Sequence, residues 1–239
     1  MGLAPESGIR GRFRVYVRDE AKTIALRQLA EGGPQAVSVN AIAKELGMSG
    51  PALYRYFAGR DALFTELVTD AYLDLTAAVA SAVAPEADSD TGSDTGPKAG
   101  PGPRERLRDF AAAYRGWATA QPHRYRLLFA APFPGYDAHA EELVAAAQQL
   151  MAVLDGVLAG LPGDEGPAGL GAGFDAWARG RAPEGAAPAT TLRGLVTWSR
   201  LHGLVRLEIE GNYASMGLDP GVLFESEVAA LLRTPVTGA

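Results

Sequence analysis

The chain has 239 residues, a formal net charge of −6 at pH 7 and no cysteine. The lack of cysteine excludes disulfides, thiol catalysis and cysteine-based metal sites. A hydrophobic content of 47% beside 21% charged residues is typical of a soluble globular protein. The sequence has no long uncharged apolar run, and its basic N-terminus lacks the apolar core of a secretory leader. We therefore expect a cytoplasmic protein that does not span a membrane.

The charges are divided unevenly along the chain. Residues 1–60 carry nine Lys and Arg against five Asp and Glu, whereas residues 61–239 carry thirteen against twenty-three. A protein with a basic first part and an acidic remainder would meet the phosphates of a nucleic acid with one end only.

The first expected helix runs from about Val17 to Glu31 and is followed by two glycines that end it. Its inward positions are Val17, Ala21, Ile24 and Ala25. A basic arm lies ahead of it and at its start, made of Arg10, Arg12, Arg14 and Arg18. The arm is interpreted either as a flexible segment on phosphates or in the minor groove, or as a solvated tail.

Residues 38–57, SVNAIAKELGMSGPALYRYF, have the pattern of two short helices joined by a tight turn. Apolar residues of the first helix fall at i, i+3, i+4 and i+7, and Gly47 suits a left-handed helix end. Pro51 fits the first turn of the second helix, which Leu53 and Phe57 bury on one thin stripe. The pattern predicts a helix-turn-helix whose second helix enters the major groove of DNA.

The residues left facing outward are the candidate DNA contacts. Hydroxyl-bearing side chains are expected to hold phosphates, and the start of the second helix is expected to approach base edges, where small residues allow close contact. The expected phosphate contacts are Ser38, which also caps the first helix, Ser49 and Tyr54. The residues expected near base edges are Gly50, Pro51 and Ala52, with Arg55 and Tyr56 at bases or phosphates and Arg60 at the DNA backbone.

The spacing of these residues resembles the signature of the tetracycline-repressor-like (TetR/AcrR) transcriptional regulators. The match covers about residues 14–70 and comprises Ser38, Ile42-Ala43, Leu46-Gly47-Met48-Ser49, Leu53-Tyr54, Phe57 and Leu63. The element Trp198-x-x-x-His202-Gly203 resembles the C-terminal domain of one branch of that family. The resemblance implies an all-α chain, with a helix-turn-helix head in residues 1–60 and a ligand-binding and dimerisation body in residues 61–239.

The helical period continues through the body and raises the expected number of helices to about nine. It predicts helices over residues 60–83, 104–120, a short stretch after Pro122, 138–161, 190–211 and from an N-cap at Asp219 onward. Residues 84–103 and 162–190 are expected to be flexible loops. The first loop holds two Asp-Thr-Gly triplets, at Asp90 and Asp94, without the apolar strands of an aspartic protease. The second holds Phe174 and Trp177, which suit one helical turn.

The last two helices carry apolar stripes that are too wide for one subunit to leave open. The resemblance implies that they pair with their copies in a homodimer, which would present two recognition helices to a near-palindromic operator. The expected interface residues are Leu192, Leu195, Val196, Phe224, Val228, Leu231 and Leu232.

Aromatic side chains recur along the body helices at helical spacing, which predicts first of all a packed core. Their number also allows a pocket for a small apolar or aromatic effector. The candidate pocket residues are Tyr114, Trp117, Tyr125, Phe129 and Trp198. His202 is expected to be hydrogen-bonded inside the body rather than bound to metal, because His123 and His139 show no ligand spacing with it.

Three functions are compatible with these patterns. The first is a repressor that a small-molecule ligand releases from its operator, and the second is a ligand-blind DNA-binding regulator. The third is a helical enzyme or small-molecule carrier, against which stands the lack of a nucleophile elbow, a zinc motif or a phosphate loop. We therefore expect a transcriptional regulator that is not an enzyme and needs no cofactor and no metal.

Overall fold

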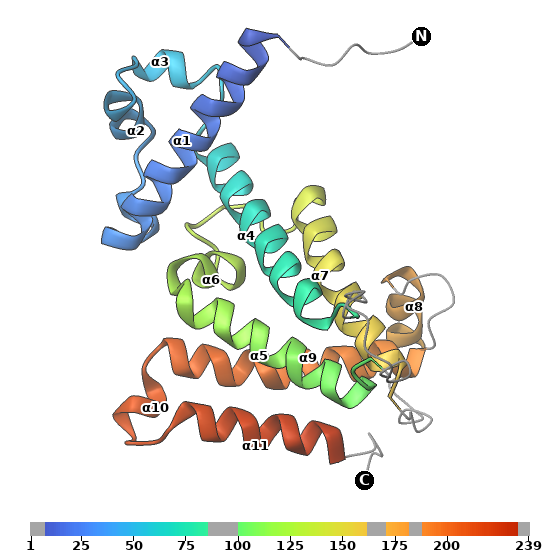
Figure 1. Ribbon diagram of the computed structural model, residues 1–239. Coiled ribbons are helices and arrows are strands. Elements are labelled where there is room, and N and C mark those ends of the chain that lie inside the picture. Colours follow the sequence, from blue (N-terminus) through green and yellow to red (C-terminus); the bar gives the residue numbers. More distant parts are fainter. Residues whose placement is uncertain (1–7, 86–99, 162–170, 182–187, 234–239) are drawn as a thin grey trace, which may run out of the picture. The chain divides into compact units, whose positions relative to one another are not determined.

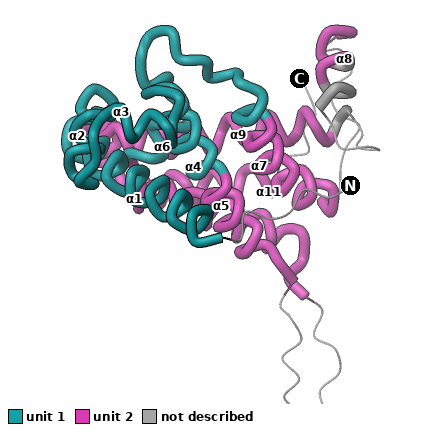
Figure 2. Tube along the Cα trace, turned by 90° about the horizontal axis from the view of Figure 1, so that it is seen from above, with its two compact units in different colours: residues 1–72, 123–144 teal, residues 73–122, 145–239 magenta. Residues whose placement is uncertain are grey.

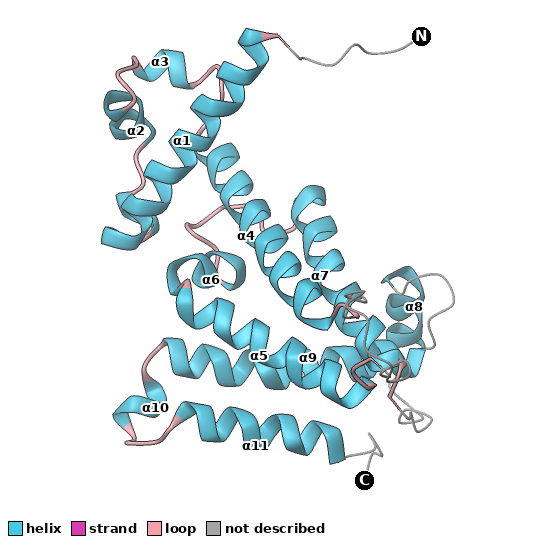
Figure 3. Ribbon diagram, viewed as in Figure 1, coloured by secondary structure: helices cyan, strands magenta, loops and turns pink. Residues whose placement is uncertain are grey.

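A computed structural model describes residues 8–85, 100–161, 171–181 and 188–233. All regular structure in these residues is helical, as predicted (Figures 1 and 3). The helices are α1 (Ile9–Gly32), η1 (Pro34–Ala36, a 3-10 turn), α2 (Val39–Glu45), α3 (Gly50–Leu53), α4 (Arg60–Val83), α5 (Pro103–Ala120), α6 (Pro122–Phe129), α7 (Glu141–Ala159), α8 (Gly171–Arg181), α9 (Pro188–Ile209), α10 (Asn212–Ser215) and α11 (Pro220–Arg233).

The chain forms two compact units (Figure 2). The first unit comprises residues 1–72 and 123–144, and the second comprises residues 73–122 and 145–239. Helices α4 and α7 contribute residues to both units. The functional boundary expected at residue 60 stays a prediction.

The core of the first unit is built from α1, α2, α3 and the first half of α4. Ala21, Ile42, Leu53 and Leu63 are completely buried there. Helix α1 ends where two glycines follow one another, and Gly33 has the positive φ of 70° that the turn requires. The inward face predicted for α1 is confirmed, because Val17, Ala21, Ile24 and Ala25 are all buried.

Helix α1 begins at Ile9, eight residues earlier than predicted. Arg10, Arg12 and Arg14 therefore lie on its first two turns rather than in a flexible arm. The sequence did not indicate these turns because they bury little: the side chains of Phe13 and Tyr16 are 58% and 59% exposed. An apolar stripe, which is the signal of a packed helix, begins only with the buried residues further along.

The second unit packs α5 against α9 and α11. Phe110 and Tyr114 of α5, Leu201 and Val205 of α9 and Phe224 of α11 are buried in this core. The predicted start of the last helix is confirmed. Asp219 accepts hydrogen bonds from the backbone N–H groups of Gly221 at 2.7 Å and Val222 at 3.4 Å.

Two helices were missed. Helix α8 lies in the segment expected to be a loop with one helical turn, and the rings of its Phe174 and Trp177 are 5.6 Å apart. Helix α10 is a single turn that follows Gly211 at φ 76° and buries Tyr213. The high Gly and Ala content around α8 conceals its helical period. Asp90 and Asp94 of the predicted linker lie outside the described residues.

By length and composition alone, α7 could cross a membrane. One third of its most apolar window is buried inside the protein. Leu150, Leu154 and Leu158 recur at helical spacing and are almost fully buried. This pattern is that of a core helix.

Candidate functional site

The candidate DNA-binding surface is formed by α2, α3 and the turn that follows α3. Leu53 is completely buried and Phe57 is 2% exposed, so both hold this segment on the core as predicted. Helix α3 is shorter than predicted, since it ends at Leu53 and continues as turns. Tyr54 is 51% exposed and Arg55 is also exposed, which leaves both free to reach a ligand outside the unit.

The two serines expected at phosphates differ in their local role. The Ser38 hydroxyl oxygen accepts from the backbone N–H of Ala41 at 3.3 Å, which confirms the predicted cap of α2. A hydroxyl that accepts in this way can still donate its proton to a phosphate. Ser49 occupies the N-cap position of α3 without a side-chain cap bond, and it is exposed.

Gly50 has a structural role that the sequence did not reveal. A Cβ at this position would lie 2.6 Å from Oδ1 of Asn40, an exposed residue of α2. The glycine therefore allows the Asn40 amide to lie against the start of α3. An exposed amide beside the recognition segment is a further candidate DNA contact, because Asn can pair with adenine in the major groove. Its position on the outer side of α2 was the only signal in the sequence.

A hollow of about 400 Å³ lies between the start of α1 and the recognition segment. Its lining residues are Arg10, Phe13 and Arg14 from α1 with Met48, Ala52, Arg55 and Tyr56. Arg10, Arg14 and Arg55 form no ion pair with any described residue. Three uncompensated positive charges thus surround one hollow beside α3.

Arg18 does not line this hollow. Its guanidinium donates to the carbonyl oxygen of Tyr56 at 2.6 Å, pairs with Glu66 and lies 5.0 Å from the Phe57 ring. These contacts connect α1, α4 and the turn after α3. Arg18 is therefore a positioning residue for the recognition segment.

Arg60 also points into the first unit, and this geometry argues against its predicted contact with the DNA backbone. It donates to the carbonyl oxygens of Pro34 at 2.6 Å and Val37 at 3.3 Å. The guanidinium carbon lies 5.1 Å from the ring of Phe64 and 4.7 Å from that of Phe133. These contacts connect the first turn of α4 to the segment before α2. The sequence could not reveal them, because they depend on residues far apart along the chain.

Three of the five aromatic residues expected to form one pocket belong to the second unit and two belong to the first. In the second unit, Tyr114 and Trp198 have ring centroids 5.0 Å apart, and Trp117 donates its indole N–H to Asp74 at 2.9 Å. In the first unit, Tyr125 and Phe129 are 4.9 Å apart. The pocket made by all five stays a prediction.

His202 completes the cluster of Tyr114 and Trp198. Its Nδ1 lies 3.3 Å from the Tyr114 hydroxyl, and its ring stacks on Trp198 at 5.8 Å. The predicted internal hydrogen bond is therefore confirmed. Burial, followed by the positive charge of Arg206, lowers the pKa of His202, which favours the neutral ring. The neighbouring Gly203 does not serve close helix packing within the subunit, because a Cβ there would meet no atom within 4 Å.

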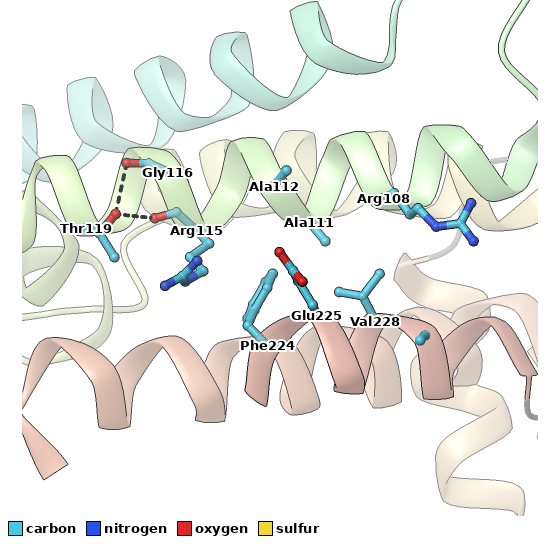
Figure 4. A pocket seen from close by; sticks show the side chains of 10 residues that line it. Arg108, Ala111, Ala112, Arg115, Gly116, Thr119, Phe224, Glu225 and Val228 are labelled. Carbon is cyan, nitrogen blue, oxygen red and sulfur yellow. Dashed lines mark hydrogen bonds between the residues drawn. The ribbon is translucent and has the colours of Figure 1, made fainter. Parts of the chain in front are cut away.

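A hollow of about 540 Å³ lies between α5 and α11 and contains none of the predicted pocket residues (Figure 4). Buried Ala111, Phe224 and Val228 provide its apolar surface. Arg115 lies at one part of it and forms two hydrogen bonds to Glu208, at 2.7 and 2.8 Å. Arg108 lies at another part of the hollow, nearer the start of α5 (Figure 4).

Most residues expected at the dimer interface are buried inside one subunit. Their exposed fractions are between 4% and 9% for Leu192, Phe224, Val228, Leu231 and Leu232, and Val196 is half-buried. Leu195, at 38%, is the exposed member of the set. These stripes cover the core of the second unit, so burial within one subunit already accounts for them. The interface that these residues were expected to form stays a prediction. A larger exposed apolar set is Leu195, Leu207, Met216, Leu218 and Val222.

A helix-turn-helix with an exposed recognition segment on a helical chain defines a DNA-binding transcriptional regulator of the helix-turn-helix class. Comparison with known families gives the particular family. Residues 24–67 match the model of bacterial regulatory proteins of the tetR family, and residues 107–231 match the tetracyclin repressor-like C-terminal domain. The chain belongs to the tetR family of bacterial transcriptional regulators. Regulators of this family bind DNA and act as dimers.

Individual relatives agree with this assignment. The HTH-type transcriptional regulator Rv1816 of Mycobacterium tuberculosis is 33% identical over 224 residues, which cover 89% of this chain and 90% of that protein. A crystal structure described as that of a regulatory protein, SCO4313, has 39% identity and a TM-score of 0.72, with 95% of this chain and 100% of that chain covered. FadR of Bacillus subtilis in complex with stearoyl-CoA, at 13% identity and a TM-score of 0.57, shares the fold over 90% of this chain and 97% of its own.

Proposed function

We propose that this regulator is a repressor that binds a near-palindromic operator as a homodimer and leaves it when a small-molecule effector binds. It acts in the cytoplasm, where the DNA is, and has no catalytic activity. The observation that carries the proposal is the concentration of uncompensated positive charge beside the exposed recognition segment.

The proposed DNA contacts divide into two groups. Phosphates are held by the hydroxyl groups of Ser38, Ser49 and Tyr54, which positions the segment without reading sequence. Base edges are approached by Gly50, Pro51 and Ala52, with Arg55, Tyr56 and the neighbouring Asn40 at their sides. We add Arg10, Arg12 and Arg14 of α1 to the phosphate contacts and leave out Arg60, whose guanidinium is committed to carbonyl oxygens.

The dimer is proposed to form through the exposed side of α9. Leu195, Ser199, Gly203 and Leu207 recur every four residues, so they lie on one side of the helix. Leu195 and Leu207 are 38% and 44% exposed, and Gly203 faces open space. A stripe with leucines at its ends and small residues between them suits a second helix packed closely across it. The two recognition segments would then lie about one turn of DNA apart, roughly 34 Å.

The effector is proposed to bind in the second unit near the cluster of Tyr114, Trp198 and His202. Such a cluster offers an apolar surface with a few polar groups, which is typical of small-molecule sites. The same fold in FadR of Bacillus subtilis is seen in complex with stearoyl-CoA, a molecule with a long apolar acyl chain. To weaken the affinity for DNA tenfold, an effector must bind the DNA-incompetent arrangement more tightly by about 1.4 kcal/mol.

A mobility-shift titration with the DNA beside the chain's own gene tests the proposal. We expect a retarded complex whose mass corresponds to two subunits, and we expect it to dissociate when a metabolite extract of the host cell is added. A complex that forms but ignores every extract would favour the ligand-blind regulator. The absence of any preference for that DNA over a scrambled duplex would refute the repressor of its own gene.

Fluorescence locates the effector in the same experiment. Binding beside Trp198 or Trp117 should change tryptophan emission over the concentration range that releases DNA. If Trp117→Ala and Trp198→Ala variants fold, bind DNA and respond as wild type does, the effector binds elsewhere in the chain.

A further inference from the structure

Helix α7 carries a carboxylate, that of Asp155, which forms no ion pair with any described residue. The Oδ1 atom of Asp155 is buried and forms no hydrogen bond within the second unit. Burial raises the pKa of Asp155 from 3.8 to about 6. At neutral pH the side chain is largely ionised, and the burial of Oδ1 without a hydrogen bond costs stability.

The fold makes specific room for this carboxylate on α9. A Cβ at Gly194 would lie only 2.3 Å from Oδ1 of Asp155, so any other residue there would displace the carboxylate. The same position is 3.9 Å from Cδ1 of Leu158. The carboxylate thus lies against the backbone of α9 at an apolar contact between two helices.

A second unsatisfied group lies on α9, in the turn before Gly194. Thr191 is 7% exposed, and its hydroxyl oxygen is buried without a hydrogen-bond partner. Thr191 precedes Gly194 by three residues, which places both on the same side of the helix. Buried polar groups are almost always hydrogen-bonded, so each of these two unsatisfied atoms requires an explanation.

These two atoms do not stabilise the subunit, because the Oδ1 of Asp155 and the Thr191 hydroxyl oxygen are buried without a hydrogen-bond partner. Their unused hydrogen-bonding capacity and the negative charge of Asp155 suit a ligand that brings hydrogen-bond donors and positive charge into an apolar site. An ammonium or amidinium group would donate to the Asp155 carboxylate and accept nothing, while a hydroxyl such as that of Thr191 can either donate or accept. An anionic ligand would be repelled.

We infer that Asp155 selects a cationic effector with an apolar body, which binds between α7 and α9 and is held by the Asp155 carboxylate and the Thr191 hydroxyl. The inference rests on the proposed effector-controlled function and names the charge of the effector. It also predicts a reporter: Trp198 follows Gly194 by one helical turn, so its indole lies on the same side of α9 as the carboxylate.

Three small probes with the same phenethyl skeleton test the charge preference. Phenethylammonium is positive, phenethyl alcohol is neutral and hydrocinnamate is negative. Their affinities are measured by isothermal titration and by tryptophan fluorescence at neutral pH, without DNA. We expect wild type to bind phenethylammonium at least tenfold more tightly than the alcohol and to bind hydrocinnamate most weakly.

Two variants give the test its specificity. Asp155→Asn keeps the shape of the side chain and removes its charge, and it should abolish the preference for the cation. Asp109→Asn removes the same charge from α5 and should keep the preference. In wild type, the affinity for phenethylammonium should also fall as the pH is lowered below 6, where the Asp155 carboxylate becomes protonated.

The inference is overturned if wild type binds the cation no more tightly than the alcohol, including the case in which neither binds. It is also overturned if Asp155→Asn keeps the cation preference. Operator release is measured separately by fluorescence anisotropy. Asp155-dependent cation binding that leaves the operator bound would support the assigned site and refute effector-controlled release.

Discussion

Replacement of Arg60 distinguishes a positioning role from a DNA contact. Its side chain makes two hydrogen bonds, to Pro34 and Val37, and lies over the rings of Phe64 and Phe133. Each hydrogen bond is worth about 1 kcal/mol net, and each ring contact at a partly exposed site is worth about 0.5 kcal/mol. We therefore expect Arg60→Ala to lower the free energy of unfolding by about 3 kcal/mol.

The assay is urea unfolding followed by circular dichroism, with Arg60→Lys as the matched variant. Lysine keeps the charge but lacks the planar fork that serves two carbonyl oxygens at once, so we expect a loss of about 2 kcal/mol. Operator binding is measured where every variant is folded. If Arg60 instead held a phosphate, Arg60→Ala would unfold as wild type does. The slope of log affinity against log salt would then become shallower by about 0.9 for each phosphate that is no longer neutralised, and this combination would refute the reasoning.

Three further predictions concern the other surfaces. Tyr54→Phe should weaken binding to all DNA sequences without changing the unfolding midpoint, as judged by anisotropy and circular dichroism, because only the exposed hydroxyl is removed. Leu207→Glu should yield monomers in light scattering that no longer bind the operator, whereas Leu73→Glu, at another exposed leucine, should stay dimeric. Asp155→Asn should unfold at higher urea than wild type at neutral pH, by on the order of 1 kcal/mol after allowance for partial solvent screening. Because the folded pKa of Asp155 is raised from 3.8 to about 6, its penalty grows as the pH rises through this window, and the two proteins should converge below pH 3.8.

Elements set by local chemistry could be predicted from the sequence. Helix α4 spans Arg60–Val83 as expected, because a continuous apolar stripe ends just before Pro85. The cap at Ser38, the left-handed Gly47 at φ 68° and the cap at Asp219 are all interactions within a few residues. Such signals do not depend on the rest of the fold.

Features set by distant contacts could not be predicted in this way. The apolar stripe of α11 predicts that Phe224 and Val228 are buried. The helical spacing of apolar residues cannot show whether a partner subunit or α5 of the same subunit buries them. The spacing of the aromatic residues predicted that they are buried, but not which of their rings contact one another. Arg60 and Arg18 were basic residues beside a DNA-binding motif, and only tertiary structure revealed the carbonyl oxygens, rings and carboxylate that hold them.

The salt dependence of operator binding tests the central claim most directly. Anisotropy of a labelled operator duplex is measured over a range of salt for wild type, Arg14→Gln and Arg108→Gln, two variants that each remove one exposed arginine without an ion pair among the described residues. If the α1 and α3 surface binds the phosphates, the slope of log affinity against log salt should become shallower for Arg14→Gln by about 0.9 per phosphate that is no longer neutralised. It should stay at the wild-type value for Arg108→Gln. A wild-type slope for Arg14→Gln together with a shallower one for Arg108→Gln would contradict the account and would assign DNA binding to the other unit.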